Sequence, residues 1–481
     1  MGDIRTHARR WPAVLCLVLA SGFLSGGYCT DRGYYTPGGS GTRAEQTANG
    51  PVSRFGSVFI DGAEYATTAA TVSVDGVSTS VAALRVGQIV LMRGTVGSST
   101  SAGQAASLVA TSKLIGPVTA RDLAGGTLTV LGQTVQITGD TSVGDGIAPT
   151  EPGGLVLGQL VAVDGYRTSS GLIASRLDAA TGSLLRVSGR VASLSGAAQT
   201  FQLNGTTVGY AGVAGGLVPA ITNGSYVLAS GSSVGGSATL VAQTVTLQDE
   251  ATAGAGGTHG TLHGAVTRFA SSSSFDIAGQ AVSTGVATVY SGGLATDIAA
   301  DAEIEVEGQY DAAGVLAASA VALVPTSVFR VVGSVERIDA VAATFTVAGI
   351  ALANASITRW DDRSPALMRA ISYGDLRIGD WVEVRGVSTA AATANARVVE
   401  RRALPVSPLT ELQDQATAVA DPSLTLAGIV IDTRGAGFAS IDGATLTRLQ
   451  FFAMASGHVV RVRGIITAGG AFVATTVMLR N

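Results

Sequence analysis

Two histidines with the spacing of metal ligands, His259 and His263, stand in the segment THGTLHG. On a helix this spacing places both imidazoles on one face, where they suit a single metal ion. The segment leads into a strand, however, and four residues of a strand span about 13 Å, which is too far for one ion. No cysteine or carboxylate is close to them in the sequence, so we predict two linker histidines and no metal site.

Four carboxylates alternate with apolar residues in the segment DAEIEVE, residues 301–307. They belong to Asp301, Glu303, Glu305 and Glu307. Because alternate residues of a strand point to the same side, these four share one face. A calcium ion or a basic partner could use such a row, but Ca²⁺ normally takes ligands that converge from a loop. We therefore predict a solvated outer face that also discourages edge pairing.

An aromatic side chain, two carboxylates and an arginine gather in the segment WDDR, residues 360–363. Binding residues are concentrated on loops that a rigid scaffold positions. Trp360, Asp361 and Asp362, together with Trp381, are therefore the candidate ligand-binding residues.

Motifs for catalysis are missing from the sequence. It has no nucleophile elbow, no Walker loop and no dinucleotide fingerprint, and no histidine lies near a plausible serine or cysteine partner for a triad. Single-stranded nucleic acid needs aromatic side chains beside a basic groove, whereas this chain is 5% aromatic with a net charge of −4. We predict no enzyme, no cofactor and no nucleic-acid partner.

The first 27 residues have the features of an export signal. Arg5, Arg9 and Arg10 precede an apolar stretch at 11–24 that is too short for a stable membrane span. Small residues follow, and cleavage after Gly27 is expected. The protein is therefore predicted to be exported to the periplasm, the outer membrane or the cell surface, without a transmembrane span.

Cys29 is the only cysteine left once Cys16 is removed with the signal, so the mature chain has no intramolecular disulfide. A lone cysteine just after a signal indicates a lipoprotein, in which the thiol is acylated. The preceding residues, Gly26 and Tyr28, depart from the usual lipoprotein pattern. Two alternatives stay open, an N-terminal lipid anchor at Cys29 and a secreted or periplasmic protein with a free thiol. The polar segment 28–54 predicts a flexible tether.

The phrase LRIGDWVEVRG, residues 376–386, recurs along the chain. Its other copies occupy 84–94, 155–165, 221–231, 298–308 and 454–464. Alternation within the phrase predicts that Val382 and Val384 point inward and that Trp381, Glu383 and Arg385 point outward. Gly379 and Gly386 are expected to be turns that bracket the strand.

A Gly-x-Val strand and a hairpin glycine precede each copy, 15 to 20 residues apart. In the first copy this pair is Gly56 and Gly76, and in the last copy it is Gly428 and Gly443. Alternating apolar residues with glycine turns at short intervals predict antiparallel β-structure. Units of about 65 residues exceed the 20–45 residues of solenoid repeats and fit small closed barrels, which have no exposed edges.

We predict an all-β fold, a tandem array of six small antiparallel OB-like β-barrels joined by short linkers, with short helices only in inter-strand loops. One helix is expected from the Ser364-Pro365 start to about Ser372, and another within 444–456. The predicted boundaries are 1–27 for a signal peptide, 28–54 for the tether, 55–114, 115–184 and 185–250 for repeats 1 to 3, 251–326 for a linker with repeat 4, 327–404 for repeat 5 with an inserted short helix, and 405–481 for a linker with repeat 6.

This order of strands and glycine turns resembles the bacterial family catalogued as domain of unknown function 5666, over nearly all of 55–481. The resemblance implies small β-barrel modules, often in tandem and often on exported lipoproteins, and it implies no catalytic residues. Asp301, which replaces the first glycine of the phrase in repeat 4, is the clearest departure and concerns the turn geometry there.

We therefore expect a non-enzymatic structural or interaction protein of the cell envelope, whose partner is an envelope component or another protein. The alternative is a periplasmic or surface protein that binds an oligosaccharide or a cell-wall fragment.

Overall fold

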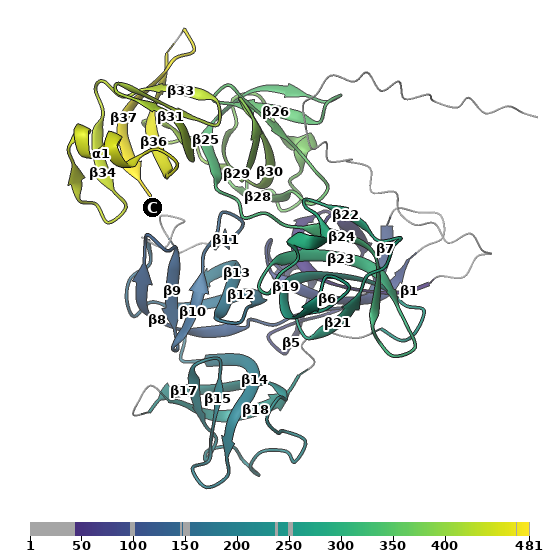
Figure 1. Cartoon of the computed structure of the whole chain (residues 1–481). Coiled ribbons are helices and arrows are strands. Elements are labelled where there is room, and N and C mark those ends of the chain that lie inside the picture. Colours follow the sequence, from purple (N-terminus) through teal and green to yellow (C-terminus); the bar gives the residue numbers. More distant parts are fainter. Residues whose placement is uncertain are drawn as a thin grey trace, which may run out of the picture. The chain divides into compact units, whose positions relative to one another are not determined.

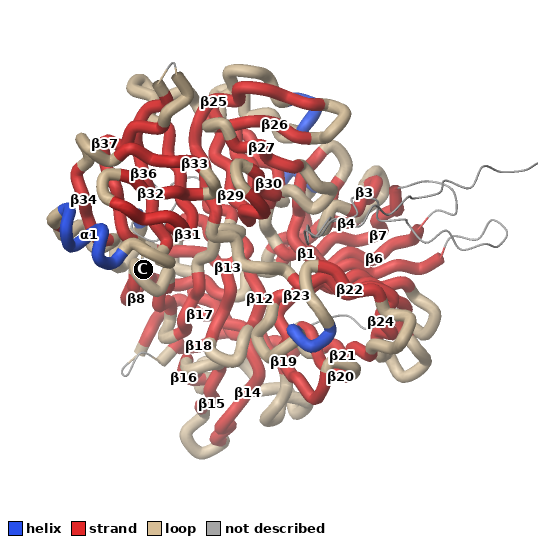
Figure 2. The backbone as a smooth tube through the Cα atoms, turned by 45° about the horizontal axis from the view of Figure 1, so that its top comes forward, coloured by secondary structure: helices blue, strands red, loops and turns tan. Residues whose placement is uncertain are grey.

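The structure is a computed structural model that describes residues 44–96, 102–144, 147, 154–235, 239–248, 254–467 and 469–480. The predicted signal peptide, Cys29 and residues 28–43 of the predicted tether lie outside this part of the chain. Strands form most of the described backbone, and helices are confined to short segments (Figure 2). No helix among the described residues is both long enough and apolar enough to cross a membrane.

The first repeat closes into a five-stranded barrel. Its strands are β1 (Ala44–Phe55), β2 (Val58–Ile60), β3 (Ala63–Ala66), β6 (Ile89–Val96) and β7 (Ala102–Ala110). Pairing runs from β1 to β2, β3, β7 and β6, and then back from β6 to β1. Only the β3–β7 pair is parallel. Because β1 begins at Ala44, residues 44–54 belong to the barrel and the prediction of a tether up to residue 54 is wrong for them.

The same closed circuit recurs along the chain, with the last strand of each repeat pairing in parallel with the third. In circuit order the strands of repeats 2 and 3 are β8 (Leu114–Asp122), β9 (Thr127–Val130), β10 (Gln133–Gln136), β13 (Gly171–Ala179) and β12 (Leu160–Arg167), then β14 (Leu185–Ser195), β15 (Thr200–Leu203), β16 (Thr206–Gly209), β18 (Leu240–Leu247) and β17 (Tyr226–Val234). Repeat 4 uses β19 (His259–Ser271), β20 (Ser274–Ile277), β21 (Gln280–Ser283), β24 (Leu316–Leu323) and β23 (Glu303–Tyr310). Repeats 5 and 6 use β25 (Phe329–Asp339), β26 (Thr344–Val347), β27 (Ile350–Ala353), β30 (Thr393–Arg402) and β29 (Trp381–Ala390), then β31 (Thr410–Ala420), β32 (Ser423–Leu426), β33 (Ile429–Asp432), β37 (Phe472–Leu479) and β36 (Val459–Ile466). Figure 1 labels many of these strands.

Short additional strands and helices fill the connections. The strands are β4 (Thr71–Val74), β5 (Val77–Thr79), β11 (Ser142–Val143), β22 (Val289–Ser291), β28 (Arg359–Arg363), β34 (Gly437–Ser440) and β35 (Thr445–Leu446). The one α-helix among the described residues is α1 (Arg448–Met454), inside the segment where a helix is expected. Single 3₁₀ turns cover Val81–Ala83, Ala295–Asp297 and Tyr373–Asp375.

Strand pairing continues from one repeat into another. Strand β1 pairs in parallel with β19, which joins repeats 1 and 4 into one sheet. Strands β8 and β14 pair antiparallel across repeats 2 and 3, and β25 and β31 do so across repeats 5 and 6. The sequence predicts barrels joined by short linkers and does not predict this pairing of strands between them. The described chain forms three sheets that each run through two repeats.

The hairpin between the second and third strands has the same turn in every repeat. Asp61 and Gly62 both have positive φ, +47° and +79°, as the two-residue turn of a tight hairpin requires. The equivalent pairs are Leu131-Gly132, Asn204-Gly205, Ala278-Gly279, Ala348-Gly349 and Ala427-Gly428.

This register corrects the predicted pairs of glycines in the first and last copies. Gly56 lies in the turn between β1 and β2, and the β1 residue equivalent to the first-strand glycine elsewhere is Gly50. In the last copy Asp414 takes that position, opposite Val460, and Gly428 is the hairpin glycine.

The final glycine of the phrase is not a turn. Strand β29 runs through Gly386, and the pairing register with β30 shifts between Arg385 and Gly386, which marks a β-bulge. A Cβ at Gly386 would overlap the carbonyl oxygen of Asn395, so only glycine fits this close approach. The same shift occurs at Gly94, Gly165, Gly231, Gly308 and Gly464.

The predicted helix at 364–372 is absent. Asp362 accepts backbone N–H bonds from Ser364 at 2.9 Å and from Met368 at 2.7 Å, which folds the segment into turns. Leu367 has a φ of +46°, and a helix cannot continue through that conformation.

Apolar side chains fill the inside of each circuit. Val382 and Val384 are fully buried in the core shared by repeats 5 and 6, which confirms their inward orientation. The residues equivalent to Val382 in the other copies of the phrase are equally buried. They are Val90, Val161, Val227, Ile304 and Val460. Trp381, Glu383 and Arg385 alternate with the inward valines, yet they too are buried, because other strands and repeats cover the outer face of the barrel.

Candidate functional site

A histidine held between carboxylates forms the centre of a buried polar cluster. His263 lies on β19, Asp61 lies in the β2–β3 turn, and Glu303 and Glu305 lie on β23. The Nδ1 atom of His263 is 2.7 Å from Asp61 Oδ1, and its Nε2 atom is 2.9 Å from Glu303 Oε1. Asp61 is 202 residues away from His263 in sequence, so the cluster joins repeat 1 to repeat 4.

Sheet register brings these side chains together. In the β19–β23 pair His263 lies opposite Glu305, so both point to the same face. In the parallel β1–β19 pair Asn49 lies opposite Leu262, which places Gly50 next to His263. A Cβ on Gly50 would overlap the Asp61 carboxylate, so the glycine provides the space in which that carboxylate sits.

Electrostatics favour a charged imidazole at this position. Burial by itself lowers the pKa of His263, but the charge and hydrogen bond of Asp61, together with those of Glu303, raise this pKa to about 10. Tyr166 of β12 stacks on the imidazole, with ring centroids 4.9 Å apart and planes 11° from parallel. Repeat 2 therefore also covers the cluster.

A small cavity of about 20 Å³ opens beside Asp61, His263 and Glu305. Its remaining polar lining includes Asp140 of repeat 2 and Arg359 and Arg397 of repeat 5. This volume is enough for a water molecule or a small ion. Residues from four repeats thus line one cavity.

Asp140 anchors repeat 2 to repeat 5 beside that cavity. Its carboxylate accepts hydrogen bonds from Ser327 Oγ at 2.7 Å and Arg397 Nε at 2.9 Å, and its carbonyl oxygen accepts one from Arg359 at 2.6 Å. Burial raises the pKa of Asp140, but the two arginines and Ser327 outweigh it and lower that pKa below its usual value. The side chain therefore stays ionised.

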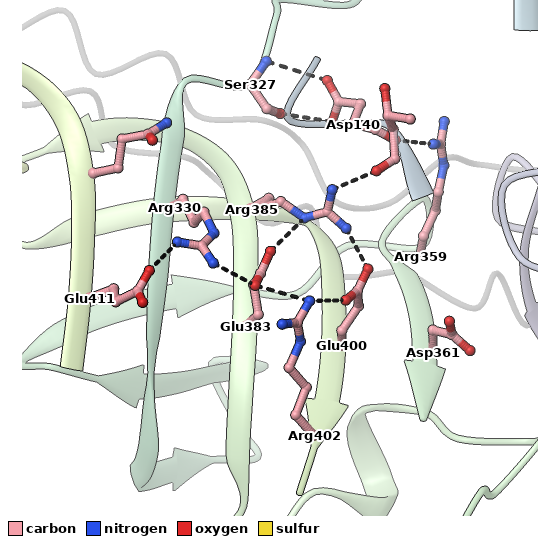
Figure 3. A network of polar contacts seen from close by, with 12 residues as sticks. Asp140, Ser327, Arg330, Arg359, Asp361, Glu383, Arg385, Glu400, Arg402 and Glu411 are labelled. Atoms are coloured by element: carbon pink, nitrogen blue, oxygen red, sulfur yellow. Dashed lines mark hydrogen bonds and ion pairs between the residues drawn. The ribbon is translucent and has the colours of Figure 1, made fainter. Parts of the chain in front are cut away.

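A second network of ion pairs lies on the outer face of β29 (Figure 3). Arg330 bridges Glu383 at 2.8 Å and Glu411 at 2.6 Å, and so links repeat 5 to β31 of repeat 6. Arg402 bridges Glu383 and Glu400, at 3.1 and 2.6 Å. Burial would raise the pKa of Glu383, yet the surrounding arginines hold it far below its usual range.

Arg385 extends this network to repeat 2. It contacts Glu400 at 2.5 Å and Glu383 at 3.3 Å, and it donates to the carbonyl oxygen of Thr141 at 2.5 Å. Figure 3 shows Arg385 between these glutamates and Asp140, which lies in the turn before β11. The two polar clusters therefore meet at Asp140 and Thr141.

The structure separates the two histidines of the H-x₃-H segment. Both lie on β19, as the strand spacing implies, but His263 is 4% exposed inside an interface between repeats, so the prediction of a linker histidine is wrong for it. The predicted solvated face is also wrong in part, because Glu305 is buried and Glu303 binds His263.

Asp301 keeps the turn of the phrase and adds a contact. Its φ of +65° resembles that of Gly379, +92°, so the departure from glycine does not change the left-handed turn. Its carboxylate accepts hydrogen bonds from the backbone N–H of Ser169, at 2.6 Å, and from the Ser169 hydroxyl. The aspartate that replaces glycine at this position therefore joins repeat 4 to repeat 2.

The candidate ligand-binding residues do not form one surface. Trp360 is 1% exposed in the core, where its Nε1 donates to Asn354 at 3.2 Å. Trp381 is 8% exposed, and Asp362 forms an ion pair with Arg401 at 2.5 Å. Only Asp361, half-buried beside Arg363, is open to solvent to an appreciable degree.

Asp61 is the site residue that sequence reasoning missed. The available signal was its position, since an aspartate stands in the hairpin turn where the other repeats have leucine, asparagine or alanine. The sequence pattern predicts Gly76 as the hairpin glycine of repeat 1, one hairpin too late, so it does not align Asp61 with the turn residues of the other repeats.

A wider groove of about 470 Å³ lies between repeats 2 and 4. Gln136, Thr138 and Ile173 line one side, and Asp301 and Glu303 line the other. Glu303 thus belongs both to the lining of the groove and to the His263 cluster.

One protein family matches the chain at several of the repeats. The profile of the family described as "Domain of unknown function (DUF5666)" matches residues 115–178, 263–322, 332–400 and 415–478, which together make up more than half of the chain. No curated protein matches the chain. The protein is therefore a member of the DUF5666 family, with the domain present in tandem.

Proposed function

We propose that this chain is an exported, non-enzymatic structural or interaction protein of the cell envelope, built as an array of six OB-like β-barrels. The order of strands supports the OB-like description, because each circuit runs from the first to the second, third, fifth and fourth strand. Helix α1 lies directly before the fourth strand of repeat 6, the place where an OB-fold carries its helix.

The observation that carries this proposal is the burial of the outward side chains of the phrase. Glu383 and Arg385 vary between copies, as binding residues on a repeated module would, but both are buried. Arg385 contacts repeat 2, and Glu383 binds Arg330, which also pairs with Glu411 of repeat 6. In the same way, Arg186 of repeat 3 pairs with Asp75 of repeat 1. Variable residues that bind other repeats support a role as a scaffold.

The organisation of the barrel interiors supports the same role. The circuits of repeats 1 and 4 each enclose a core of tightly buried apolar side chains, and those of repeats 2 and 3 and of repeats 5 and 6 share one core per pair. A filled interior leaves the outer surface as the part of each module that meets a partner. A cell-envelope component or another protein is the expected partner.

Export and anchoring are tested on the protein purified from the membrane and soluble fractions of a bacterial host. Intact mass and N-terminal sequencing identify the first residue of the mature chain. We expect Tyr28 if the signal is cleaved after Gly27, or an acylated Cys29 if the protein is a lipoprotein. With an anchor, Cys29→Ser moves the protein from the detergent phase to the aqueous phase. Retention of residues 1–27 in a cytoplasmic protein would refute export.

The scaffold role is tested by deleting the gene in its bacterium and measuring leakage of periplasmic proteins. Wild type should restore the barrier, and Arg330→Met, which removes the ion-pair bridge between repeats 5 and 6, should restore it less. The matched variant Arg268→Met, in an exposed pair on β19, should act as wild type. An unaltered envelope in the deletion strain contradicts the proposal.

Binding of an oligosaccharide or cell-wall fragment is a second candidate, favoured by the groove between repeats 2 and 4. Amide, hydroxyl and carboxylate groups of Gln136, Thr138 and Asp301 line it, and such groups hydrogen-bond sugar hydroxyls. Thr326→Trp should fill the groove and abolish binding on a glycan array, whereas Val341→Trp, on an exposed loop, should not. An array without any saturable ligand would exclude this candidate.

A further inference from the structure

The cluster around His263 has the composition of a transition-metal site. Asp61, His263 and Glu305 each offer one ligand atom, and these atoms all lie within 4.8 Å of one another. Imidazole nitrogen and carboxylate oxygen are ligands that Zn²⁺ prefers, and three of them leave a fourth position for water. The three residues come from two repeats that the parallel β1–β19 pair holds side by side.

The second ring nitrogen of the histidine also has a carboxylate partner, here called the outer contact. A metal-bound histidine usually donates its second ring N–H to a carboxylate, which fixes the orientation of the ring. Here His263 Nε2 is 2.9 Å from Glu303 Oε1, while Nδ1 faces Asp61. The stacked ring of Tyr166 further restricts the imidazole. His263 is therefore oriented with Nδ1 toward the carboxylates that would complete the site.

An unpartnered oxygen marks the place for a ligand. Asp61 Oδ2 has no hydrogen-bond partner among the described residues. Water cannot readily replace such a partner, because the Asp61 side chain is only 5% exposed. A buried oxygen without a partner costs free energy, which a bound ion would recover. The cavity of about 20 Å³ beside Asp61, His263 and Glu305 is the size of one ion or one water.

The charges of the cluster also suit a divalent ion. Asp140 and the three carboxylates around His263 carry four negative charges, and Arg359 and Arg397 carry two positive charges. Binding of the ion at Nδ1 displaces the proton of that nitrogen to solvent and leaves the imidazole neutral. Two negative charges then remain, and a divalent ion balances them. The arginines are directed to Asp140, through its carboxylate and its carbonyl oxygen, which leaves the His263 side of the cavity to the carboxylates.

We propose that Asp61, His263 and Glu305 bind one divalent transition-metal ion of the Zn²⁺ class, which joins repeat 1 to repeat 4. Ligand atoms of tetrahedral Zn²⁺ lie about 3.4 Å apart, so Glu305 moves closer and the Asp61–His263 contact of 2.7 Å opens by less than 1 Å. Because the cavity is buried and lined by residues of four repeats, the bound ion holds these repeats together, with water as its fourth ligand.

The test uses the full-length chain, stripped of metal with a chelator and titrated with Zn²⁺ alone in a calorimeter. Wild type should bind one equivalent at this site, and Co²⁺ should give the absorption of a tetrahedral N/O site. Asp61→Asn and Glu305→Gln should each weaken Zn²⁺ binding by about 100-fold or more. Glu303→Gln, which removes the negative charge of the outer contact, should weaken it by about 10- to 100-fold.

Two further variants guard against an effect of misfolding. Gly50→Ala keeps every ligand but displaces the Asp61 carboxylate, and it should weaken binding as well. Glu307→Gln, two residues from Glu305 on the same strand, should bind as wild type. Folding of each variant is checked by circular dichroism. Absence of Zn²⁺ binding in wild type, or equal binding in the folded Glu305→Gln variant, overturns the proposal and leaves the cluster as an imidazolium ion pair.

Discussion

Buried carboxylates of this chain differ in what surrounds them. Glu383 is enclosed by three arginines, which keep it ionised. Asp164 of β12 is equally buried, but its Oδ1 has no hydrogen-bond partner among the described residues. Burial and the charges of Asp75 and Asp178 raise the pKa of Asp164 to about 7, against the opposing effect of Arg176 and Lys113. Asp164 therefore binds a proton more tightly in the folded chain than in the unfolded one.

A pH-dependent loss of stability follows from Asp164. The unfolded pKa is 3.8 and the folded pKa is about 7, so its protonated form favours folding below pH 4, and this contribution is lost as pH rises toward 7. The total is on the order of 4 kcal/mol. Asp164→Asn, which cannot ionise, should therefore be as stable as wild type near pH 3.5 and more stable at pH 8. Urea titrations at both pH values measure this, and a pH-independent difference would contradict the assignment.

Breaking the Arg330 bridge should destabilise the chain strongly. Arg330→Met removes the cation that Glu383 and Glu411 share and leaves them with Arg385, Arg402 and Arg463, at a cost of about 2–3 kcal/mol. Arg268→Met removes an exposed partner of Asp276 and should change the free energy of unfolding little. Denaturant midpoints of the two variants compare them directly, and similar midpoints would show that the network is not needed.

Two sets of glycines shape the strands of each barrel, and they act in different ways. The hairpin glycines permit positive φ, whereas the last glycine of the phrase permits close approach at a β-bulge. Sequence spacing alone located both sets but did not tell a turn from a bulge, because each is a glycine at the end of an alternating run. The bulge became evident only from the pairing of β29 with β30.

Substitution at the bulge should weaken the barrel that contains it. Gly386→Ala places a Cβ against the carbonyl oxygen of Asn395, a backbone atom that cannot rotate away, and should cost about 2–3 kcal/mol. Gly437→Ala in β34 is the control, because nothing lies within 4 Å of its added Cβ and its φ is not positive. Equal unfolding free energies for the two variants would exclude the bulge as a close contact.

Period-two alternation was sufficient to predict which residues fill the barrels, as Val382 and Val384 show. It could not predict what covers the outward residues, because that depends on which repeats pair. The contact of Asp61 with His263 crosses 202 residues, and no local pattern encodes it. The helix expected after Ser364 failed for a related reason, since Asp362 binds the backbone N–H groups of Ser364 and Met368.

At the scale of the whole molecule, the repeats depend on one another. Small barrels have marginal cores of their own, and here sheets continue from repeat 1 to 4, from 2 to 3 and from 5 to 6. Polar contacts at Asp140, Asp301 and Arg385 connect those three sheets. Such contacts between modules predict that the modules unfold together.

Differential scanning calorimetry of the full-length chain tests this interdependence most directly. The structure predicts one main unfolding transition for the wild type, and a split into separate transitions for Asp140→Ala, which removes the carboxylate that binds Ser327 and Arg397. Several independent transitions in the wild type, unchanged in Asp140→Ala, would contradict the account and describe barrels that fold separately.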